Sequence, residues 1–262
     1  MRWARFMNGD SPAFAIVEEE HLLPVRGSPF ESWERTGRRV ALADARLLVP
    51  VVPQTFYACG MNYVEHVKAY TQTATSSSSS AVPTRPEVGY RANNALIAHG
   101  EPIVIPRDAT EHVQYEGELV VVIGKRAKNL TEADALSCVF GYTIGNDVSE
   151  RSWQKSDRTF WRSKNTDTFK PMGPWIETDV DLNTLKTSVF VNGERHIEFP
   201  TNHMLFGVAK FIATMTQYLT LHPGDVIWMG TEGSPRNIAA GDVVEVTITG
   251  IGTLRNPVWR EA

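Results

Sequence analysis

Residues 115–124 constrain the fold most, because they read as a single strand with two carboxylates at its start. The apolar run of Leu, Val and Ile ends on a glycine, which is typical of a strand inside a sheet. Residues two apart on a strand point to the same face, so Glu116 and Glu118 project together. Two neighbouring carboxylates beside such an apolar run repel each other unless a positive charge lies between them.

Two interpretations of this acidic pair are compatible with the pair alone. A divalent cation satisfies both acids, because Mg²⁺ prefers carboxylate and water oxygens as ligands. Alternatively, the strand begins in water and both carboxylates are simply solvated. Asp147 favours the cation, since it follows an apolar strand at 141–146 that delivers its carboxylate to a strand end inside the fold. We therefore predict a metal site made of Glu116, Glu118 and Asp147.

Cationic and amide side chains follow the predicted metal site along the chain. Arg151 and Gln154 come directly behind Asp147, and Lys164 stands a short distance further on. Donors of this kind beside a metal suit an anionic substrate that is rich in oxygen. Taken singly, Arg151 reads equally well as a surface residue of a helical turn.

A histidine precedes a serine-rich stretch in the first third of the chain. Asn62 is expected to cap a short helix that carries His66. Residues 71–80, which follow, cannot bury enough apolar area to offset the entropy of ordering them, so we expect a mobile loop. A helix beside such a loop can act as a lid that brings in a general base. The alternatives are an interdomain linker for the loop and a structural role for His66.

Charge and composition exclude several classes of function. The chain has 262 residues, a net charge of −4 and a pI near 6.0, which argues against nucleic acid or an anionic membrane as the main partner. The N-terminus lacks the apolar run of a signal peptide, and no window approaches the ~18 apolar residues of a membrane span. Cys59 and Cys138 lie in apolar contexts, so we interpret them as reduced thiols of a cytoplasmic protein rather than as a disulfide.

Turn and strand signals divide the chain into two parts. Residues 1–50 read as short strands and turns closed by prolines, which predicts a small β-rich N-terminal annex. Residues 51–262 are expected to form the main domain, in which strand signals dominate. The dipeptide Asn192-Gly193 predicts a hairpin with a type I′ turn. The chain is therefore predicted to be α+β and mostly β.

Two longer helices are expected in the main domain. Thr131 is a suitable N-cap for the first, with acidic residues in the opening turn. The second carries an apolar stripe at helical spacing from Met204 to Leu219 and stops at Pro223-Gly224. We interpret that stripe as core packing.

Taken in order along the chain, these pieces resemble the fumarylacetoacetate hydrolase family. The resemblance spans residues 56–258, and its specificity lies in the ordered set rather than in one motif. The matching stretches are Cys59-Gly60-Met61-Asn62-Tyr63 with His66, Glu116-Gly117-Glu118, Gly141-Tyr142-Thr143, Asn146-Asp147-Val148-Ser149 with Arg151, Lys164 with Asp167-Thr168-Phe169, Pro171-Met172-Gly173-Pro174, Val191-Asn192-Gly193-Glu194, Pro223-Gly224-Asp225, Gly230-Thr231 and Gly250-Ile251-Gly252.

The resemblance implies a fold and a set of site residues. The fold would be a mixed β-sandwich roll, usually dimeric, and the acidic triad would hold Mg²⁺, with Mn²⁺ as an alternative. By matching position, the residues that act on the substrate would be Arg151, Gln154 and Lys164, with His66 as the base carried on the lid. Tyr90, Arg91 and Thr231 would contribute to the substrate pocket.

The resemblance also implies the chemistry. Family members hydrolyse C–C bonds of acylpyruvates or related diketo acids, and others decarboxylate, isomerise or hydrate 2-oxo-dienoates. We expect a metal-dependent hydrolase of a 2-oxo or diketo acid, in the catabolism of aromatic or related compounds. The alternative is a decarboxylase, isomerase or hydratase that uses the same enolate chemistry. A metal-stabilised binding protein without catalysis is the reading least compatible with the retained residues.

The sequence departs from the family pattern in three places. Ala69 stands where hydrolytic relatives often carry a glutamate that orients the lid histidine, which favours the alternative chemistry. Arg91 stands where relatives usually have a lysine, so a charge is retained with a different geometry. The chain continues after Gly230-Thr231 as Glu232-Gly233, where a proline and glycine are commoner.

Overall fold

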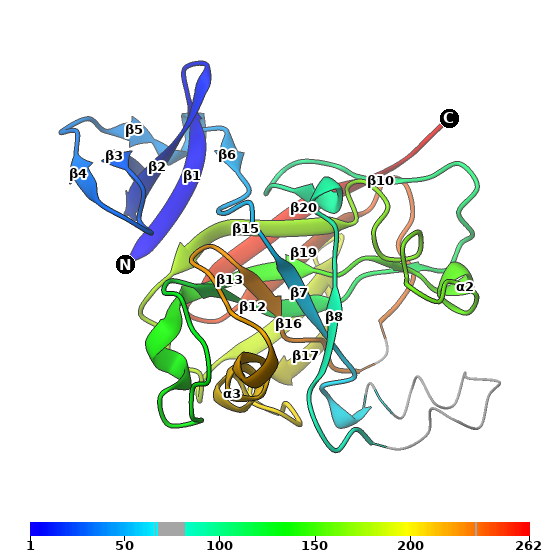
Figure 1. Cartoon of the computed structure of the whole chain (residues 1–262). Coiled ribbons are helices and arrows are strands. Elements are labelled where there is room, and N and C mark those ends of the chain that lie inside the picture. Colours follow the sequence, from blue (N-terminus) through cyan, green and yellow to red (C-terminus); the bar gives the residue numbers. More distant parts are fainter. Residues whose placement is uncertain (66, 68–81, 234) are drawn as a thin grey trace.

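The computed structural model describes residues 1–65, 67, 82–233 and 235–262. Strands make up most of its regular structure, and they form sheets that mix parallel and antiparallel pairs (Figure 1). The expectation of an α+β, mostly β chain with a mixed β-sandwich roll is confirmed. His66, Ala69 and the serine-rich stretch 71–80 lie outside the described residues.

A 13-stranded sheet combines strands from the N-terminal residues with strands from the rest of the chain. Its spatial order is β4 (Trp33–Arg35), β3 (His21–Gly27), β2 (Ser11–Glu18), β1 (Arg2–Asn8), β15 (Lys170–Glu177), β13 (Val139–Asn146), β12 (Gly117–Ile123), β18 (Val226–Trp228), β7 (Phe56–Gly60) and β8 (Glu87–Tyr90). Three short strands pair beside this path, namely β5 (Val40–Ala41) with β3, β6 (Leu47–Leu48) with β1 and β9 (Leu96–Ile97) with β15.

A five-stranded sheet packs against the centre of the large one. Its order is β10 (Ile103–Ile105), β20 (Gly252–Arg260), β19 (Val243–Ile248), β16 (Lys186–Val191) and β17 (Glu194–Pro200). Asn192 and Gly193 join β16 to β17 with positive φ values of 54° and 80°, as the predicted type I′ hairpin requires. A two-stranded ladder of β11 (Val113–Gln114) and β14 (Ser149–Glu150) lies beside the region where the acidic residues gather.

Strand β12 is buried on both faces, and its alternation separates two cores. Leu119, Val121 and Ile123 face the core shared with the five-stranded sheet, whereas Val120 and Val122 face a second core. Glycine allows the closest approach of the layers. A Cβ on Gly117 would come within 2.9 Å of Val189 and Val246 side-chain atoms, closer than real Cβ contacts allow.

Helices are short, and their observed bounds correct two predictions. The predicted helix after Thr131 is only a 3-10 turn, η3 (Ala135–Cys138), because the Thr131 hydroxyl bonds Asp134 in a turn that comes first. The predicted helix from Met204 is α3 (Val208–Tyr218), because Met204 instead bridges to Tyr63 in extended backbone. Two further 3-10 turns, η1 (Leu42–Asp44) and η2 (Asn93–Ala95), and the four-residue helix α2 (Arg151–Gln154) complete the described elements.

Asn62 has a different role from the predicted helix cap. Its side chain donates to the carbonyls of Phe206 and Met229 and accepts from the Phe206 N–H. These bonds tie the end of β7 to two other segments, while helical backbone begins only at Val64. Both cysteines are free and buried, as expected.

The predicted annex, residues 1–50, contains strands β1 to β6, and it joins the strands of the predicted main domain directly. Strand β1 pairs antiparallel with β15, with Trp3 opposite Ile176. The Phe30 ring lies 4.9 Å from the Phe140 ring, centroid to centroid, so aromatic contacts also cross the junction. Figure 1 shows the annex at the upper left, attached along this edge.

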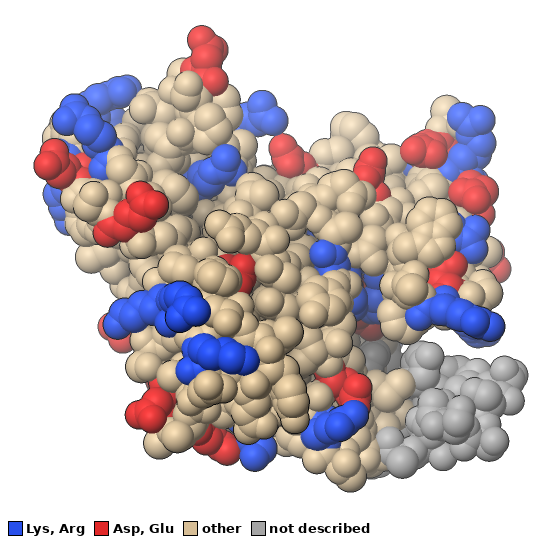
Figure 2. Space-filling model, in the orientation of Figure 1, with Lys and Arg blue, Asp and Glu red and all other residues tan. Residues whose placement is uncertain are grey.

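The surface carries mixed charge. Figure 2 shows basic and acidic side chains interspersed over one face of the molecule, with neither sign dominating it. Among the described residues, we find no helix of the length and apolar character that crossing a membrane requires.

Candidate metal and active site

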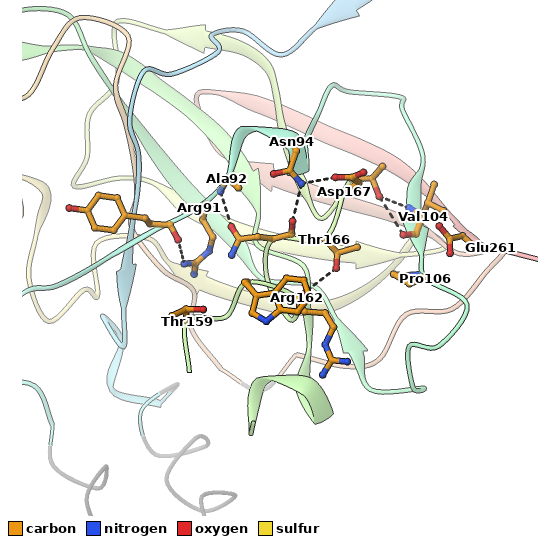
Figure 3. A pocket seen from close by; sticks show the side chains of 14 residues that line it. Arg91, Ala92, Asn94, Val104, Pro106, Thr159, Arg162, Thr166, Asp167 and Glu261 are labelled. Carbon is orange, nitrogen blue, oxygen red and sulfur yellow. Dashed lines mark hydrogen bonds between the residues drawn. The ribbon is translucent and has the colours of Figure 1, made fainter. Parts of the chain in front are cut away.

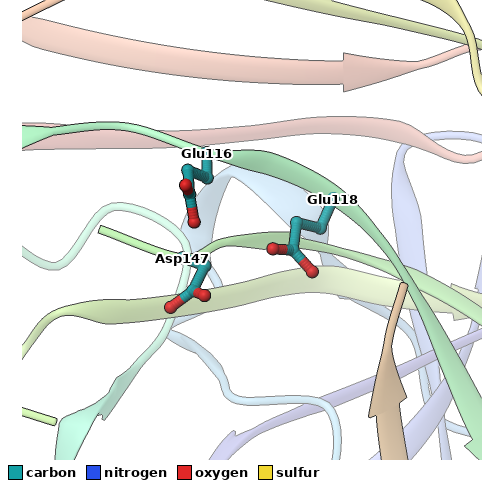
Figure 4. A group of neighbouring side chains, drawn as sticks. All are labelled: Glu116, Glu118 and Asp147. Carbon is teal, nitrogen blue, oxygen red and sulfur yellow. The ribbon is translucent and has the colours of Figure 1, made fainter. Parts of the chain in front are cut away.

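The three predicted carboxylates meet at one end of the β12–β13 pair. Glu116 lies just before β12, Glu118 is its second residue, and Asp147 follows β13 directly. One ligand oxygen from each lies within 4.8 Å of the others, and all three residues are buried at 2–3% exposure (Figure 4). The structure thus brings Asp147 together with the two acids, Glu116 and Glu118, that the strand alternation placed on one face.

Backbone bonds hold this arrangement in place. The Asp147 N–H donates to the Glu116 carbonyl at 2.8 Å, which locks the two strand ends together. The Asn146 side chain accepts from the Glu116 N–H at 3.0 Å, so Asn146 positions Glu116. Gly230, at the end of β18, donates its N–H to Glu118 Oε2 at 2.8 Å. The carboxylates are therefore fixed by the sheet before any ligand binds.

Two of the predicted polar residues, Lys164 and Arg151, contact the acids, and a third, Gln154, contacts Arg151. Lys164 Nζ bridges Glu116 Oε2 at 2.7 Å and Asp147 Oδ2 at 2.9 Å. Arg151 Nη2 lies 2.6 Å from Glu116 Oε1, and its Nη1 donates to Gln154 at 2.9 Å. The surface alternative for Arg151 is therefore not what the structure shows. Arg151 and Gln154 are the first and last residues of α2, and both side chains lie at the acidic centre.

The Arg91 guanidinium donates two hydrogen bonds to the Asp147 carboxylate. Its Nε donates to Asp147 Oδ1 at 3.2 Å and its Nη2 to Asp147 Oδ2 at 2.8 Å. A lysine cannot form this fork, so the departure noted in the sequence changes how the carboxylate is held. The Arg91 side chain is only 7% exposed.

Lys170 is a further cation that the sequence analysis missed. It is the first residue of β15, is fully buried, and places its Nζ 2.8 Å from Asp147 Oδ1. A lysine directly before Pro171 gives no local signal of burial, since lysine is among the residues least often buried. Gln114 was also missed; its side chain accepts from Arg151 Nε at 2.8 Å.

The three carboxyls differ in their electrostatic surroundings. Burial, together with the negative charges of Asp147 and Glu116, raises the pKa of Glu118 well above its usual value. Burial also acts to raise the pKa of Asp147, but Arg91, Lys164 and Lys170 hold it well below its usual range. Burial lowers the pKa of Lys170 to about 7, against the attraction of Asp147.

The residues present fit a divalent cation. Oxygen atoms of three buried carboxylates within 4.8 Å of each other are the donor set of a hard ion such as Mg²⁺ or Mn²⁺. Lys164 already bridges two of these acids as a cation. Among the described residues, the basic side chains at this centre form their ion pairs with Glu116 and Asp147, and none forms one with Glu118.

A small cavity opens at the acidic centre. It has a volume of about 100 Å³, and the three acids, Arg91, Lys164, Gln154 and Thr231 line it. Phe160 and Cys59 also line this cavity and were not predicted as site residues. His66, the predicted base, lies outside the described residues, so its place relative to the cavity stays a prediction.

Tyr90 lies elsewhere. It is 57% exposed and lines a larger groove of about 880 Å³, together with Trp161, Arg162 and Asn165 (Figure 3). Arg91 lines both the groove and the cavity, so it forms part of the wall between them. Asn165 links the segments that contain Arg91 and Phe160, because its side chain accepts a hydrogen bond from the Ala92 N–H and donates one to the Phe160 carbonyl.

The sequence matches known families over nearly its whole length. Residues 55–259 match the fumarylacetoacetate (FAA) hydrolase C-terminal family, and residues 1–50 match the Rv2993c-like N-terminal family. The chain belongs to the fumarylacetoacetate hydrolase family. The resemblance first seen in the ordered motifs is thereby confirmed.

Relatives in this family carry out different reactions. Protein Rv2993c of Mycobacterium tuberculosis is 37% identical, with 100% of this chain and 99% of the relative covered. A 2,4-didehydro-3-deoxy-L-rhamnonate hydrolase of Sphingomonas sp. (strain SKA58) is 38% identical, over 78% of this chain and 73% of its own. The mitochondrial oxaloacetate tautomerase fahd2 of Xenopus laevis is 36% identical, over 82% of this chain and 69% of its own.

Solved structures agree in fold. A structure of 5-carboxymethyl-2-hydroxymuconate delta-isomerase from Mycobacterium smegmatis is 37% identical, with a TM-score of 0.89 and full coverage of both chains. A maleylpyruvate hydrolase from Sphingobium sp. SYK-6, in complex with manganese(II) and pyruvate, is 25% identical, with a TM-score of 0.81 and full coverage of both.

Proposed function

We propose that this chain is a divalent-metal-dependent enzyme that cleaves a C–C bond of an acylpyruvate or related diketo acid by hydrolysis. The observation that carries the proposal is the buried group of Glu116, Glu118 and Asp147, with oxygens within 4.8 Å, beside the basic side chains of Arg91 and Lys164. The hydrolases among its relatives and the manganese–pyruvate complex of the maleylpyruvate hydrolase support it.

The residues around the cavity suit a 2-oxo acid. When bound, a divalent ion supplies a Lewis acid that stabilises the enolate charge formed as the C–C bond breaks. Lys164 and Arg91 border the cavity as cations and neutralise the carboxylate of the substrate. Gln154 and Thr231 supply polar groups that orient it.

The hydrolysis balances without any further reactant. The bond between the acyl carbonyl carbon and the methylene carbon of the pyruvyl part breaks, and a water oxygen becomes bonded to the acyl carbon. The methylene carbon takes up a proton, so the products are a carboxylic acid and pyruvate. His66 is the base that we propose for the water, from its place in the sequence alone.

A second function of the same site is isomerisation, tautomerisation or decarboxylation of a 2-oxo acid. The oxaloacetate tautomerase and the delta-isomerase among its relatives and solved structures favour it specifically. It needs the same enolate stabilisation, and it needs a base that moves a proton on carbon rather than one that activates water.

A product-resolved assay separates the two functions. The purified protein is incubated with Mg²⁺ or Mn²⁺ and acetylpyruvate, oxaloacetate or a 2-oxo-dienoate, with a chelator as control, and products are followed by NMR. Pyruvate and acetate from acetylpyruvate, lost on chelation, support the hydrolase. Metal-dependent keto–enol exchange, double-bond migration or CO₂ release, without cleavage of acetylpyruvate, replaces it with the second function. Turnover that chelation leaves unchanged contradicts both.

A further inference from the structure

Lys170 places a positive charge beneath the acidic centre, where solvent cannot reach it. The residue is 0% exposed and does not line the cavity. Its Nζ donates to the carbonyls of Val148 and Phe169, each at 2.9 Å, and lies 2.8 Å from Asp147 Oδ1. Three acceptors around one nitrogen require three N–H donors, which an ammonium has and a neutral amine lacks. The geometry is therefore that of a fixed cation.

Lys170 differs in this respect from the other cations that contact Asp147. Arg91 and Lys164 line the cavity, so a ligand that enters it can contact them directly. Lys170 is held at the start of β15, where Lys170 pairs with Leu96 of β9, and three oxygens enclose its ammonium. These contacts hold the Lys170 side chain next to Asp147 whatever occupies the cavity.

We propose that Lys170 lowers the affinity of the acidic centre for a divalent ion, through the positive charge that it holds against Asp147 Oδ1. The inference rests on the proposed metal-dependent function. Arg91 and Lys170 contact Oδ1, and Arg91 and Lys164 contact Oδ2. Of these three cations, Lys170 is the one that does not line the cavity.

The charge of Lys170 affects the affinity for the metal more than does any effect of Lys170 on the orientation of the Asp147 carboxylate. Without Lys170, Arg91 still holds Asp147 with two bonds, and the Asp147 N–H still donates to the Glu116 carbonyl. The orientation of the carboxylate is thus largely retained. A unit charge one carboxylate away from a divalent ion, by contrast, repels that ion strongly in a buried site. Removing the charge should therefore tighten metal binding.

The positive charge of Lys170 also means that a bound anionic ligand should raise the affinity of the site for the metal. The three acids of the centre face four basic side chains, Arg91, Arg151, Lys164 and Lys170. The basic side chains already outnumber the acids by one, so adding a divalent ion increases the positive excess, which an anionic 2-oxo acid partly offsets. Because coupling between two ligands is reciprocal, each should raise the affinity for the other. The coupling should weaken when Lys170 is neutral, which a purely structural role of Lys170 does not predict.

The test is direct titration of Mn²⁺ by calorimetry, with and without saturating pyruvate. Lys170→Met removes the charge at similar volume, and Lys170→Gln keeps donors for the two carbonyls if the methionine variant does not fold. Lys186→Met, at a half-exposed lysine of β16, is the matched control. We expect both Lys170 variants to bind Mn²⁺ ~10-fold more tightly than the parent, or better, and to gain less affinity from pyruvate.

The outcomes separate this inference from the proposed function. Tighter binding in the Lys170 variants, with the control unchanged, supports the inference. If the parent binds Mn²⁺ and folded Lys170 variants bind it equally or more weakly, the inference is overturned and the proposed function stands. If neither the parent nor any variant binds Mn²⁺, it is the metal-dependent function that fails, and the inference with it.

Discussion

At the residue scale, Glu118 is the carboxylate with the least support in the metal-free protein. Asp147 and Glu116 each form ion pairs with basic side chains, whereas within the described ranges Glu118 accepts a hydrogen bond from the Gly230 N–H and forms no such pair. Its raised pKa, caused by burial first and by the two neighbouring acids next, expresses the same imbalance. A group in this state destabilises the fold when ionised and is stabilised by a bound cation.

Glu118→Gln should therefore have opposite effects on the free and metal-loaded proteins. The neutral amide can still accept the Gly230 N–H bond, so we expect the metal-free variant to melt at a higher temperature than the parent. Its affinity for Mn²⁺ should fall by more than the roughly 10–100-fold that loss of a ligand's hydrogen-bond partner costs. Melting temperature with and without Mn²⁺, together with calorimetry, measures both.

The control for this prediction is Glu111→Gln, since the Glu111 side chain is 82% exposed. It should leave both quantities unchanged. A Glu118→Gln protein that binds Mn²⁺ as tightly as the parent would remove Glu118 from the ligand set. One that melts lower in the absence of metal would show that its charge is stabilised by something other than a bound ion.

At the element scale, the helix α2 connects the acidic centre to the rest of the fold. Glu150 precedes it and is fully buried; its carboxylate accepts from the Trp153 N–H, as a helix N-cap, and from the Thr110 hydroxyl. Arg151 and Gln154 on this helix point to the centre. Glu150 therefore acts on the site through the helix and not by contact with it.

Glu150→Ala should lower the free energy of unfolding by about 1–2 kcal/mol, the usual cost of losing an N-cap. It should also raise the KM for a 2-oxo acid more than it lowers kcat, because Arg151 and Gln154 lose their fixed orientation. Urea unfolding and steady-state kinetics measure the two effects. Glu150→Gln, which keeps an acceptor oxygen, should recover most of the KM. A KM equal to that of the parent in the alanine variant would contradict this role.

The elements also show what local sequence can and cannot predict. The strand with Glu116 and Glu118 was predictable because residue alternation fixes the direction of side chains. The bounds of α3 were not, since Met204 has the right spacing for the helix but pairs with Tyr63 through backbone in another segment. Lys170 was not predictable either, because only the pairing of distant strands buries it.

At the scale of the whole molecule, the annex and the main domain share a hydrophobic core. Trp3 and Ile16 from the annex lie in one buried cluster with Val120, Ile176 and Trp228 of the main sheet. The sequence placed a boundary near residue 50 from its turn signals. It could not reveal the pairing of β1 with β15, because strand partners far apart in the chain leave no local pattern. Since one core crosses the boundary, we expect the two parts to unfold together.

Glu177 makes this coupling measurable through pH. It lies on β15 and accepts hydrogen bonds from the Met1 amino group at 2.8 Å and from Arg2 Nε at 3.0 Å, so it ties the start of the annex to the main sheet. Burial acts to raise its pKa, but the bonds from the amino group, the Asp179 N–H and Arg2 together lower it. A carboxyl whose folded pKa is depressed stabilises the protein above its unfolded pKa, about 4.3, and loses that contribution as pH falls through the folded value.

The parent should therefore lose stability more steeply than Glu177→Gln as the pH falls below about 4.3. Urea unfolding at each pH, with no residue added before Met1 and with tryptophan fluorescence and far-UV circular dichroism followed together, gives the slopes. Coincident transitions of the two signals show that annex and main sheet unfold as one unit. Parallel pH slopes in parent and variant would mean that the Glu177 contacts contribute nothing across the junction. Two separated transitions would show that the shared core does not couple the annex to the main domain.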